Sequence, residues 1–314
     1  MKGIYEDVVQ VSKSAFINSD LISWTNNLLQ PSPLVLFSSL PVSAPFDQAS
    51  LSIDSELTSD SFIALLEDST NQIVENSSKP LIYYHPSYTP SSSELNRPTK
   101  LLGGRDEVTW PIRSIVLHIQ SPNCKKTFIR FPPFDKGSPS DQKPNPPVLG
   151  IKLPYLHFQI KPLDHTFMLQ VGVRDRDGNR ILIRASTFQT ETRWYTDSKS
   201  SDTKAGPPKL IHLPLVFPSS ENNSETKWSD LLLPLDSLIP TRFDSVDYIH
   251  VHASVRLRRI YFTSDGKQAS SVDSNSNRKI DSMQALLSTI NKSSQPIRVV
   301  IKISAQLILS SNPN

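Results

Sequence analysis

From residue 167 the chain reads Phe167-Met-Leu-Gln-Val-Gly-Val-Arg174, and six residues later it reads Ile181-Leu-Ile-Arg-Ala-Ser-Thr-Phe188. Apolar residues alternate with other residues in both runs, so each predicts a β-strand with one face in a core. Between them lies Asp175-Arg-Asp-Gly-Asn-Arg180, whose Asp, Gly and Asn residues tolerate the positive φ of a tight turn. The stretch 167–188 therefore predicts a β-hairpin.

Other strand signals flank this hairpin on both sides. They fall at 34–37, 112–120, 127–131, 157–160, 210–217, 231–235, 248–262 and 297–303. Pro154 should stand at a strand entry or an edge, because proline cannot donate to a ladder. The longest signal, 248–262, reads as one strand with Ile249, Val251 and Leu257 on its apolar face. Helix signals are few and short, at 16–29, at 59–67 after a candidate N-cap, Ser59, and at 281–290.

Many short strands with polar connections predict an all-β fold. We expect a single β-sandwich or jelly-roll-like domain with long polar insertions and one or two short helices. The predicted division is 1–37 as the N-terminal part of the core, 38–98 as an acidic Ser/Pro-rich insertion, 99–263 as the β-sandwich core, 264–296 as a polar insertion, and 297–314 as a C-terminal strand and tail. Both insertions are expected to be largely mobile, because few apolar residues offset the entropy of ordering.

Composition restricts the class of protein. Of the 314 residues, 37% are apolar, which is enough for a core. No 18-residue apolar run exists, so we expect no membrane span, and the N-terminus has no hydrophobic signal core. Cys124 is the single cysteine, which excludes an internal disulfide and a zinc site made of cysteines. The composition therefore predicts a soluble, intracellular protein.

Charge is unevenly distributed along the chain. Residues 1–98 hold 11 acidic and 4 basic residues, whereas residues 99–262 hold 16 acidic and 23 basic residues. A basic β core favours acidic partners, either nucleic acid or an acidic protein surface. Such association should weaken as the salt concentration rises.

The sequence signals for a metal site or a catalytic site are weak. Asp175, Asp177 and Asn179 are spaced like the start of a calcium loop, but the glycine is misplaced and no bidentate glutamate follows, so a turn is favoured. His250 and His252 point the same way from one strand, but a third ligand is missing, so two surface histidines are favoured. No nucleophile elbow or phosphate-binding glycine loop is present. We predict no catalytic residues, no metal, no cofactor and no enzymatic activity.

Basic side chains of the hairpin and of the longest strand are candidates for partner binding. Guanidinium groups bind carboxylates and phosphates with two parallel hydrogen bonds. In a single strand, Arg256 and Arg258 would share the exposed face of His250 and His252, although a solvated face without a partner fits the pattern equally well. The candidate set is Arg174, Arg176, Arg180, Arg184, Arg193, His250, His252, Arg256, Arg258 and Arg259.

Three blocks of this sequence resemble a known family. They are Leu149-Gly-Ile-Lys-Leu-Pro-Tyr-Leu156, Arg184-Ala-Ser-Thr-Phe-Gln-Thr-Glu-Thr-Arg193 and Ile249-His-Val-His-Ala-Ser-Val-Arg-Leu-Arg-Arg-Ile-Tyr-Phe262. Trp228 ahead of the apolar run 231–235 and the early strand 113–120 add to the likeness. Together they resemble the cilia- and flagella-associated protein 20 family over roughly residues 110–262.

The resemblance implies a β-sandwich without enzymatic activity. It implies a structural protein of axonemal doublet microtubules, at the inner junction where the B-tubule closes onto the A-tubule. The expected partners are tubulin, microtubules or other axonemal proteins, and the expected location is the cytoplasmic cytoskeleton, in the ciliary axoneme or basal body. Two alternatives are a nuclear factor that associates with nucleic acid and a jelly roll that binds glycans.

Overall fold

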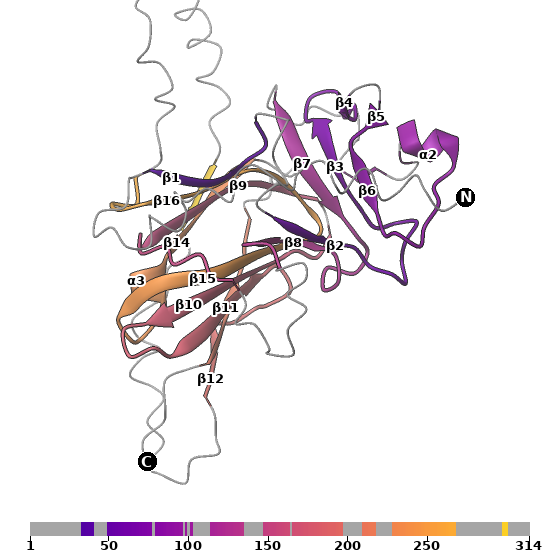
Figure 1. Ribbon diagram of the computed structural model, residues 1–314. Helices are drawn as coiled ribbons and strands as arrows, with labels where there is room; N and C mark the ends of the chain where they lie inside the picture. Colours follow the sequence, from indigo (N-terminus) through magenta and orange to yellow (C-terminus); the bar gives the residue numbers. More distant parts are fainter. Residues whose placement is uncertain are drawn as a thin grey trace, which may run out of the picture. The chain divides into compact units, whose positions relative to one another are not determined.

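The computed structural model describes residues 33–40, 49–76, 79–96, 98, 101–102, 114–134, 147–163, 165–196, 209–217 and 228–267, and the backbone of 297–300. These residues form strands β1 to β17 and two short helices, α2 (Ser92–Asn96) and α3 (Leu235–Leu238). The strands make two sheets packed together as a sandwich, which confirms the all-β prediction (Figure 1). Neither described helix is long enough and apolar enough to cross a membrane.

Sheet A contains eight strands. Along the sheet they are β17 (Ile297–Val300), β14 (Ser229–Pro234), β9 (Tyr155–Pro162), β16 (Val255–Thr263), β7 (Ile115–Gln120), β3 (Phe62–Glu67) and β6 (Ile82–Tyr84). The eighth, β1 (Leu34–Ser38), pairs with the later part of β16, whereas β7 pairs with its first three residues. All pairs are antiparallel except β14 and β17, which run parallel. The strand expected at the C-terminus therefore joins sheet A.

Sheet B contains seven strands and the predicted hairpin. Its order is β12 (Arg193–Tyr195), β13 (Leu210–Pro214), β11 (Arg180–Ser186), β10 (Met168–Asp175), β15 (Phe243–His252), β8 (Phe128–Phe131) and β2 (Ser50–Ser52). Strands β10 and β11 pair antiparallel, and the Asp175 carboxylate closes their turn by accepting hydrogen bonds from the backbone and side chain of Asn179 at 2.8 and 2.9 Å. Gly178 supplies the positive φ of 83°. A separate two-stranded ribbon, β4 (Glu75–Asn76) and β5 (Lys79–Pro80), lies outside both sheets.

The core lies between the two sheets. Alternate residues of the central strands are fully buried there, such as Leu169 and Val171 of β10 and Leu117 of β7. The rings of Phe37 in β1 and Phe131 in β8 pack 5.6 Å apart and so connect sheet A with sheet B. Each such side chain stabilises the fold by about 1.5–3 kcal/mol relative to an exposed one.

The longest strand signal forms two strands in different sheets. Strand β15 ends at His252 in sheet B, and β16 begins at Val255 in sheet A. At the crossing, the backbone N–H groups of Ala253 and Ser254 donate to the carbonyls of Thr127 and Thr166 at 3.0 and 3.1 Å. Both strands bury every second residue in the core that the two sheets share. The alternation of apolar residues therefore continues through the break. The prediction of a single strand is wrong for this reason.

The segment 59–67 forms a strand rather than a helix. Strand β3 lies between β7 and β6, and its residues 62–66 are fully buried. An unbroken apolar run of this length fits a doubly buried strand and a buried helix equally well. Farther upstream, β2 pairs with β8 in sheet B. The described part of 38–98 thus has fixed structure, contrary to the expected mobility, while the division into core and insertions stays a prediction. The helices expected at 16–29 and 281–290 fall outside the described residues, as does most of 264–296.

A buried ion cluster follows β3 on the side of sheet A that faces away from sheet B. Oδ1 of Asp68 accepts a hydrogen bond of 2.6 Å from Nη1 of Arg256, and Nζ of Lys161 lies 3.7 Å away. Oδ2 of Asp68 accepts a hydrogen bond of 2.8 Å from Nε1 of Trp228. All four side chains are buried. Part of the positive charge of the core is therefore neutralised by the acidic N-terminal part of the same chain.

The same side of sheet A holds a second buried polar cluster. Tyr261 donates to the Asp230 carboxylate at 3.2 Å, and Nδ1 of His157 lies 3.5 Å from the same carboxylate oxygen. The rings of His157 and Tyr261 stack with centroids 4.4 Å apart, and Nε2 of His157 lies 3.0 Å from Thr263 Oγ1. All of these groups are buried. This region of sheet A therefore offers its polar groups to one another and not to a partner.

We predict that Asp68→Asn destabilises the protein by about 3–5 kcal/mol, because it removes the buried negative charge that pairs with Arg256 and Lys161. The matched control is Glu56→Gln, which removes an exposed carboxylate that pairs with Lys126 on the surface. Urea unfolding of the three proteins measures the difference. Similar midpoints for both variants would contradict a structural role of the ion cluster.

Candidate partner-binding face on sheet B

One polar row of register partners crosses the outer side of sheet B. Its members, in strand order, are Arg193, His212, Arg184, Gln170, His250, Arg130 and Ser50. Side chains of paired residues point to the same side of a sheet. The residues beside them along the strands, such as Ile183, Val171 and Ile249, are buried in the core, so the row points away from it. With strands about 4.8 Å apart, the row is about 29 Å long.

The next outward row is apolar and aromatic. Its members are Tyr195, Leu210, Leu182, Gly172 and Tyr248. The ring of Tyr248 lies over Gly172, and a methyl group on this glycine would lie 2.2 Å from Cε1 of that ring. Glycine is thus required for the ring to lie flat on the sheet. The face presents a polar row beside an apolar row.

The charges on this face do not balance. Asp247 pairs with Arg174 at 3.1 Å and with Arg180 at 3.7 Å, and Glu191 pairs with Arg193 at 3.4 Å. Arg184 has no carboxylate partner among the described residues. Its Nη1 lies 3.5 Å from Nε2 of His212, and its Nε is buried without a hydrogen bond. The centre of the face therefore carries positive charge that the described part of the chain does not neutralise.

Several charged side chains shift the pKa of Tyr248. Burial raises this pKa, Arg130 opposes the rise, Asp247 adds to it, and Arg184 and Arg180 oppose it. The Arg130 guanidinium lies 4.2 Å from the Phe134 ring and 5.6 Å from the Tyr248 ring. Tyr248 thus lies near guanidinium groups that come from two strands, β8 and β11.

Half of the predicted site residues meet on this face. Arg174, Arg180, Arg184, Arg193 and His250 lie on it, and Arg176 is exposed in the hairpin turn. The prediction missed Arg130, Tyr248 and His212. Arg130 and His212 each occupy a polar position in an otherwise apolar strand, but only the register across strands shows that they join one row.

Of the remaining predicted site residues, His252 lies beside His250, with ring centroids 5.8 Å apart, and the other three lie elsewhere. Arg256 is fully buried with Asp68 in sheet A, so the expectation that it is exposed is wrong. Arg258 is the extra residue of an irregularity in β16 and has no register partner in β9. Burial lowers the pKa of Arg258, and neighbouring Arg259 lowers it further. Arg259 pairs in register with Gln159 of sheet A. None of the three belongs to the face that carries His250.

The two histidines are buried to different degrees rather than exposed. Burial lowers the pKa of His250 to about 3, and nearby His252 and Arg130 add to the shift. Burial lowers the pKa of His252 to about 4, although its hydrogen bond with the Cys124 carbonyl opposes the shift. Both rings are therefore neutral near pH 7. In the described ranges, no group of three or more His, Cys, Asp or Glu side chains is placed to hold a metal ion.

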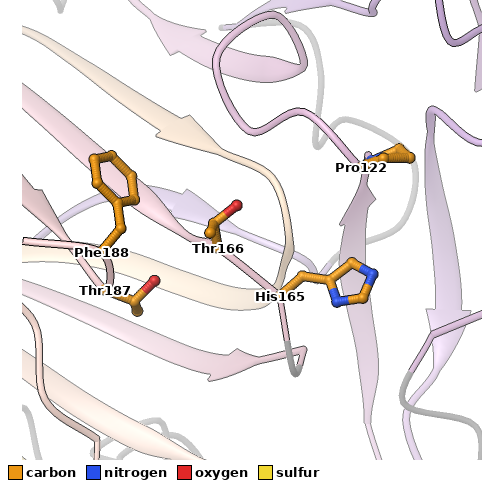
Figure 2. A pocket seen from close by; sticks show the side chains of 5 residues that line it. All are labelled: Pro122, His165, Thr166, Thr187 and Phe188. Atoms are coloured by element: carbon orange, nitrogen blue, oxygen red, sulfur yellow. The ribbon is translucent and has the colours of Figure 1, made fainter.

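A shallow pocket lies near the crossing between the sheets. Its lining residues are Pro122, His165, Thr166, Thr187 and Phe188 (Figure 2). Thr187 uses its hydroxyl to accept a hydrogen bond from the Phe167 backbone N–H at 3.0 Å. The lining offers one imidazole and two hydroxyls.

Comparison with known proteins supports the resemblance. The model of the CFA20 domain matches residues 107–204, which carry Arg130, Gln170, Arg184 and Arg193 of the polar row. Cilia- and flagella-associated protein 20 of Chlamydomonas reinhardtii is 32% identical over 152 residues, which are 48% of this chain and 67% of that protein. The chain belongs to the cilia- and flagella-associated protein 20 family.

Other members of the cilia- and flagella-associated protein 20 family match a similar share of the chain. The protein of Paramecium tetraurelia is 30% identical over 152 residues, covering 48% of this chain and 66% of that protein. The protein of Caenorhabditis elegans is 26% identical over 151 residues, covering 48% of this chain and 62% of that protein. The match thus spans about two thirds of these relatives. Membership of this family indicates a protein of cilia or axonemes.

We predict that His250 makes the protein less stable in acid. An unfolded histidine has a pKa near 6.5, whereas the pKa of folded His250 is about 3. Between these values the unfolded chain binds a proton that the folded chain does not, so stability is lost as the pH falls below about 6.5. The loss is at most about 1.4 kcal/mol per pH unit. Urea unfolding between about pH 7.5 and pH 4.5 measures it.

In this experiment His250→Phe should make the pH dependence less steep, since phenylalanine does not titrate, while His252 and His118, whose pKa values burial lowers to about 4 and about 3, still contribute. The control is His165→Gln, which removes an exposed histidine and should leave the dependence as in the wild type. Parallel curves for the wild type and His250→Phe would refute the proposed origin of the acid sensitivity.

Proposed function

We propose that this chain is a non-enzymatic structural protein of axonemal doublet microtubules, and that the outer face of sheet B binds tubulin or a tubulin-associated protein. The observation that carries the proposal is the unbalanced arginine row on this face. Four of its seven members lie in the segment that matches the CFA20 domain. An inner-junction position, as the family resemblance implies, would place such a face against acidic tubulin.

The availability of sheet B supports this choice. On sheet A, the charged groups nearest the crossing, Arg256 and Lys161, are buried with Asp68. On sheet B, Arg180 and Arg193 are more than half exposed, and Arg184 and Tyr248 are half-buried. Arginine and tyrosine are enriched at protein interfaces, where their long side chains combine apolar contact with hydrogen bonds. The composition of this face fits a protein partner.

The energetics require several contacts to act together. An exposed ion pair contributes only about 0.2–1 kcal/mol, because water and salt screen it. Arg174 and Arg180 already share Asp247, which reduces what they can offer to a partner. A stable complex therefore needs the whole face, including the apolar row of Leu182, Leu210 and Tyr195.

Of the alternatives, a nuclear factor is also compatible with a basic face. A nucleic acid would need a continuous run of cations along its phosphates. A glycan-binding jelly roll usually offers exposed tryptophans, but Trp228 is buried against Asp68 and Trp194 is half-buried. Among the described residues, no observation favours the glycan alternative.

We predict that a tagged full-length chain enters the axonemal fraction of ciliated cells and co-sediments with microtubules. Raising the salt concentration from about 50 to about 300 mM should weaken the binding, since the contacts are electrostatic and largely exposed. Single-stranded nucleic acid should not displace the protein. Nuclear accumulation together with displacement by nucleic acid would instead support the nuclear alternative.

A further inference from the structure

We propose that Arg184, Gln170 and His250 form an anion-binding subsite at the centre of the outer face of sheet B, which takes a carboxylate of an acidic protein segment. The three residues come from adjacent strands β11, β10 and β15, and they are register partners. The subsite adds detail to the proposed function. It rests on that function only in taking the partner to be an axonemal protein.

Arg184 provides the charge of the subsite. Its Nε is buried and has no hydrogen-bond partner, and the described residues offer it no carboxylate. Leaving a buried donor unsatisfied costs free energy, and the cost is larger for a charged group. A carboxylate that accepts from Nε and from a terminal nitrogen of the guanidinium recovers this energy in a bidentate pair.

Gln170 and His250 provide neutral donors beside this charge. The amide nitrogen of Gln170 has only a weak contact, 3.9 Å long, with Sδ of Met168. Nε2 of His250 is buried and without a hydrogen-bond partner. A neutral imidazole donates from Nε2 when that nitrogen carries the proton. Three donors on neighbouring strands thus converge on the side of the sheet that faces away from the core.

Tyr248 and Gly172 form the apolar wall of the subsite. The Tyr248 ring lies flat over Gly172, and its centroid is 4.9 Å from that of the His250 ring. Leu182 continues this wall as the register partner of Gly172. A side chain larger than glycine at 172 would push the Tyr248 ring away. The wall partly excludes water, which strengthens an ion pair formed beside it.

The distribution of charge favours a protein carboxylate over a nucleic acid. The unneutralised charge is centred on Arg184, whereas Asp247 and Glu191 neutralise the arginines on both sides of it. A line of phosphates would pass close to these two carboxylates and would be repelled. A single glutamate or aspartate avoids them, and apolar residues next to it in the partner can contact Leu182 and Tyr248.

The test uses the full chain and a synthetic glutamate-rich peptide of about twelve residues. Its counterpart has glutamine in place of every glutamate. Isothermal titration should show binding of the glutamate peptide only. Arg184→Gln should weaken this binding by about tenfold or more, because it removes the charge and the bidentate fork. The matched control, Arg176→Gln, removes an exposed arginine from the turn of the same hairpin and should change the affinity by less than about twofold.

Two further measurements separate binding from folding. Bound carboxylate should raise the pKa of His250, which NMR titration of the ring reports, because the anion favours the imidazolium form. Gly172→Ala should weaken peptide binding without changing the net charge, since it displaces Tyr248. Thermal unfolding checks each variant. If Arg184→Gln does not fold, Arg184→Lys replaces it, because lysine keeps the charge but lacks the fork.

The subsite is overturned if the glutamine peptide binds equally well, or if Arg176→Gln weakens binding as much as Arg184→Gln. It is also overturned, in favour of a nucleic-acid site, if a single-stranded DNA oligonucleotide binds more tightly than the glutamate peptide and depends on Arg184. Axonemal localisation without peptide binding would remove only the subsite. Peptide binding that depends on Arg184, without axonemal localisation, would remove only the proposed function.

Discussion

The pairing of Asp68 with Arg256 and Lys161 is the constraint on which the arrangement of the sandwich depends. A guanidinium and an ammonium group cannot stay buried without a counter-charge, because losing their hydration costs several kcal/mol each. The carboxylate comes from the turn after β3, 188 residues before Arg256 in sequence. It therefore fixes an N-terminal segment onto β9 and β16 in the middle of sheet A. Trp228 donates to the same carboxylate, so the start of β14 is held there as well.

This internal neutralisation separates the two outer sides of the sandwich. In sheet A, Asp68 is buried with Arg256 and Lys161, and Asp230 is buried with His157 and Tyr261, whereas Arg258 and Arg259 of the same sheet are half-buried. In sheet B, arginines outnumber carboxylates, and Arg184 keeps an unmatched charge at the centre. Part of the basic character of the sequence is thus presented on the outer side of sheet B, which is the side that we propose contacts a partner.

Sequence patterns predicted what is local and missed what depends on distant pairing. The hairpin of β10 and β11 was predictable, because its alternation and its Asp-Gly-Asn turn lie within one short stretch. The crossing at Ala253 was not predictable. Two successive strands that face one core from different sheets show the same alternation of apolar residues as a single strand. Arg256 was predicted to be exposed because its buried partner, Asp68, is 188 residues away in sequence. The polar row was predicted in part, since Arg184, Arg193 and His250 were found but the register that joins them to Arg130 and His212 was not.

The crossing between β15 and β16 also determines how the sandwich carries mechanical load. His250 on the outer side of sheet B and Arg256 in sheet A are only six residues apart along one continuous backbone. Tension applied to the face of sheet B therefore reaches sheet A through covalent bonds and not only through dispersion contacts across the core. Shear between the two layers would also strain the hydrogen bonds that Ala253 and Ser254 make with Thr127 and Thr166.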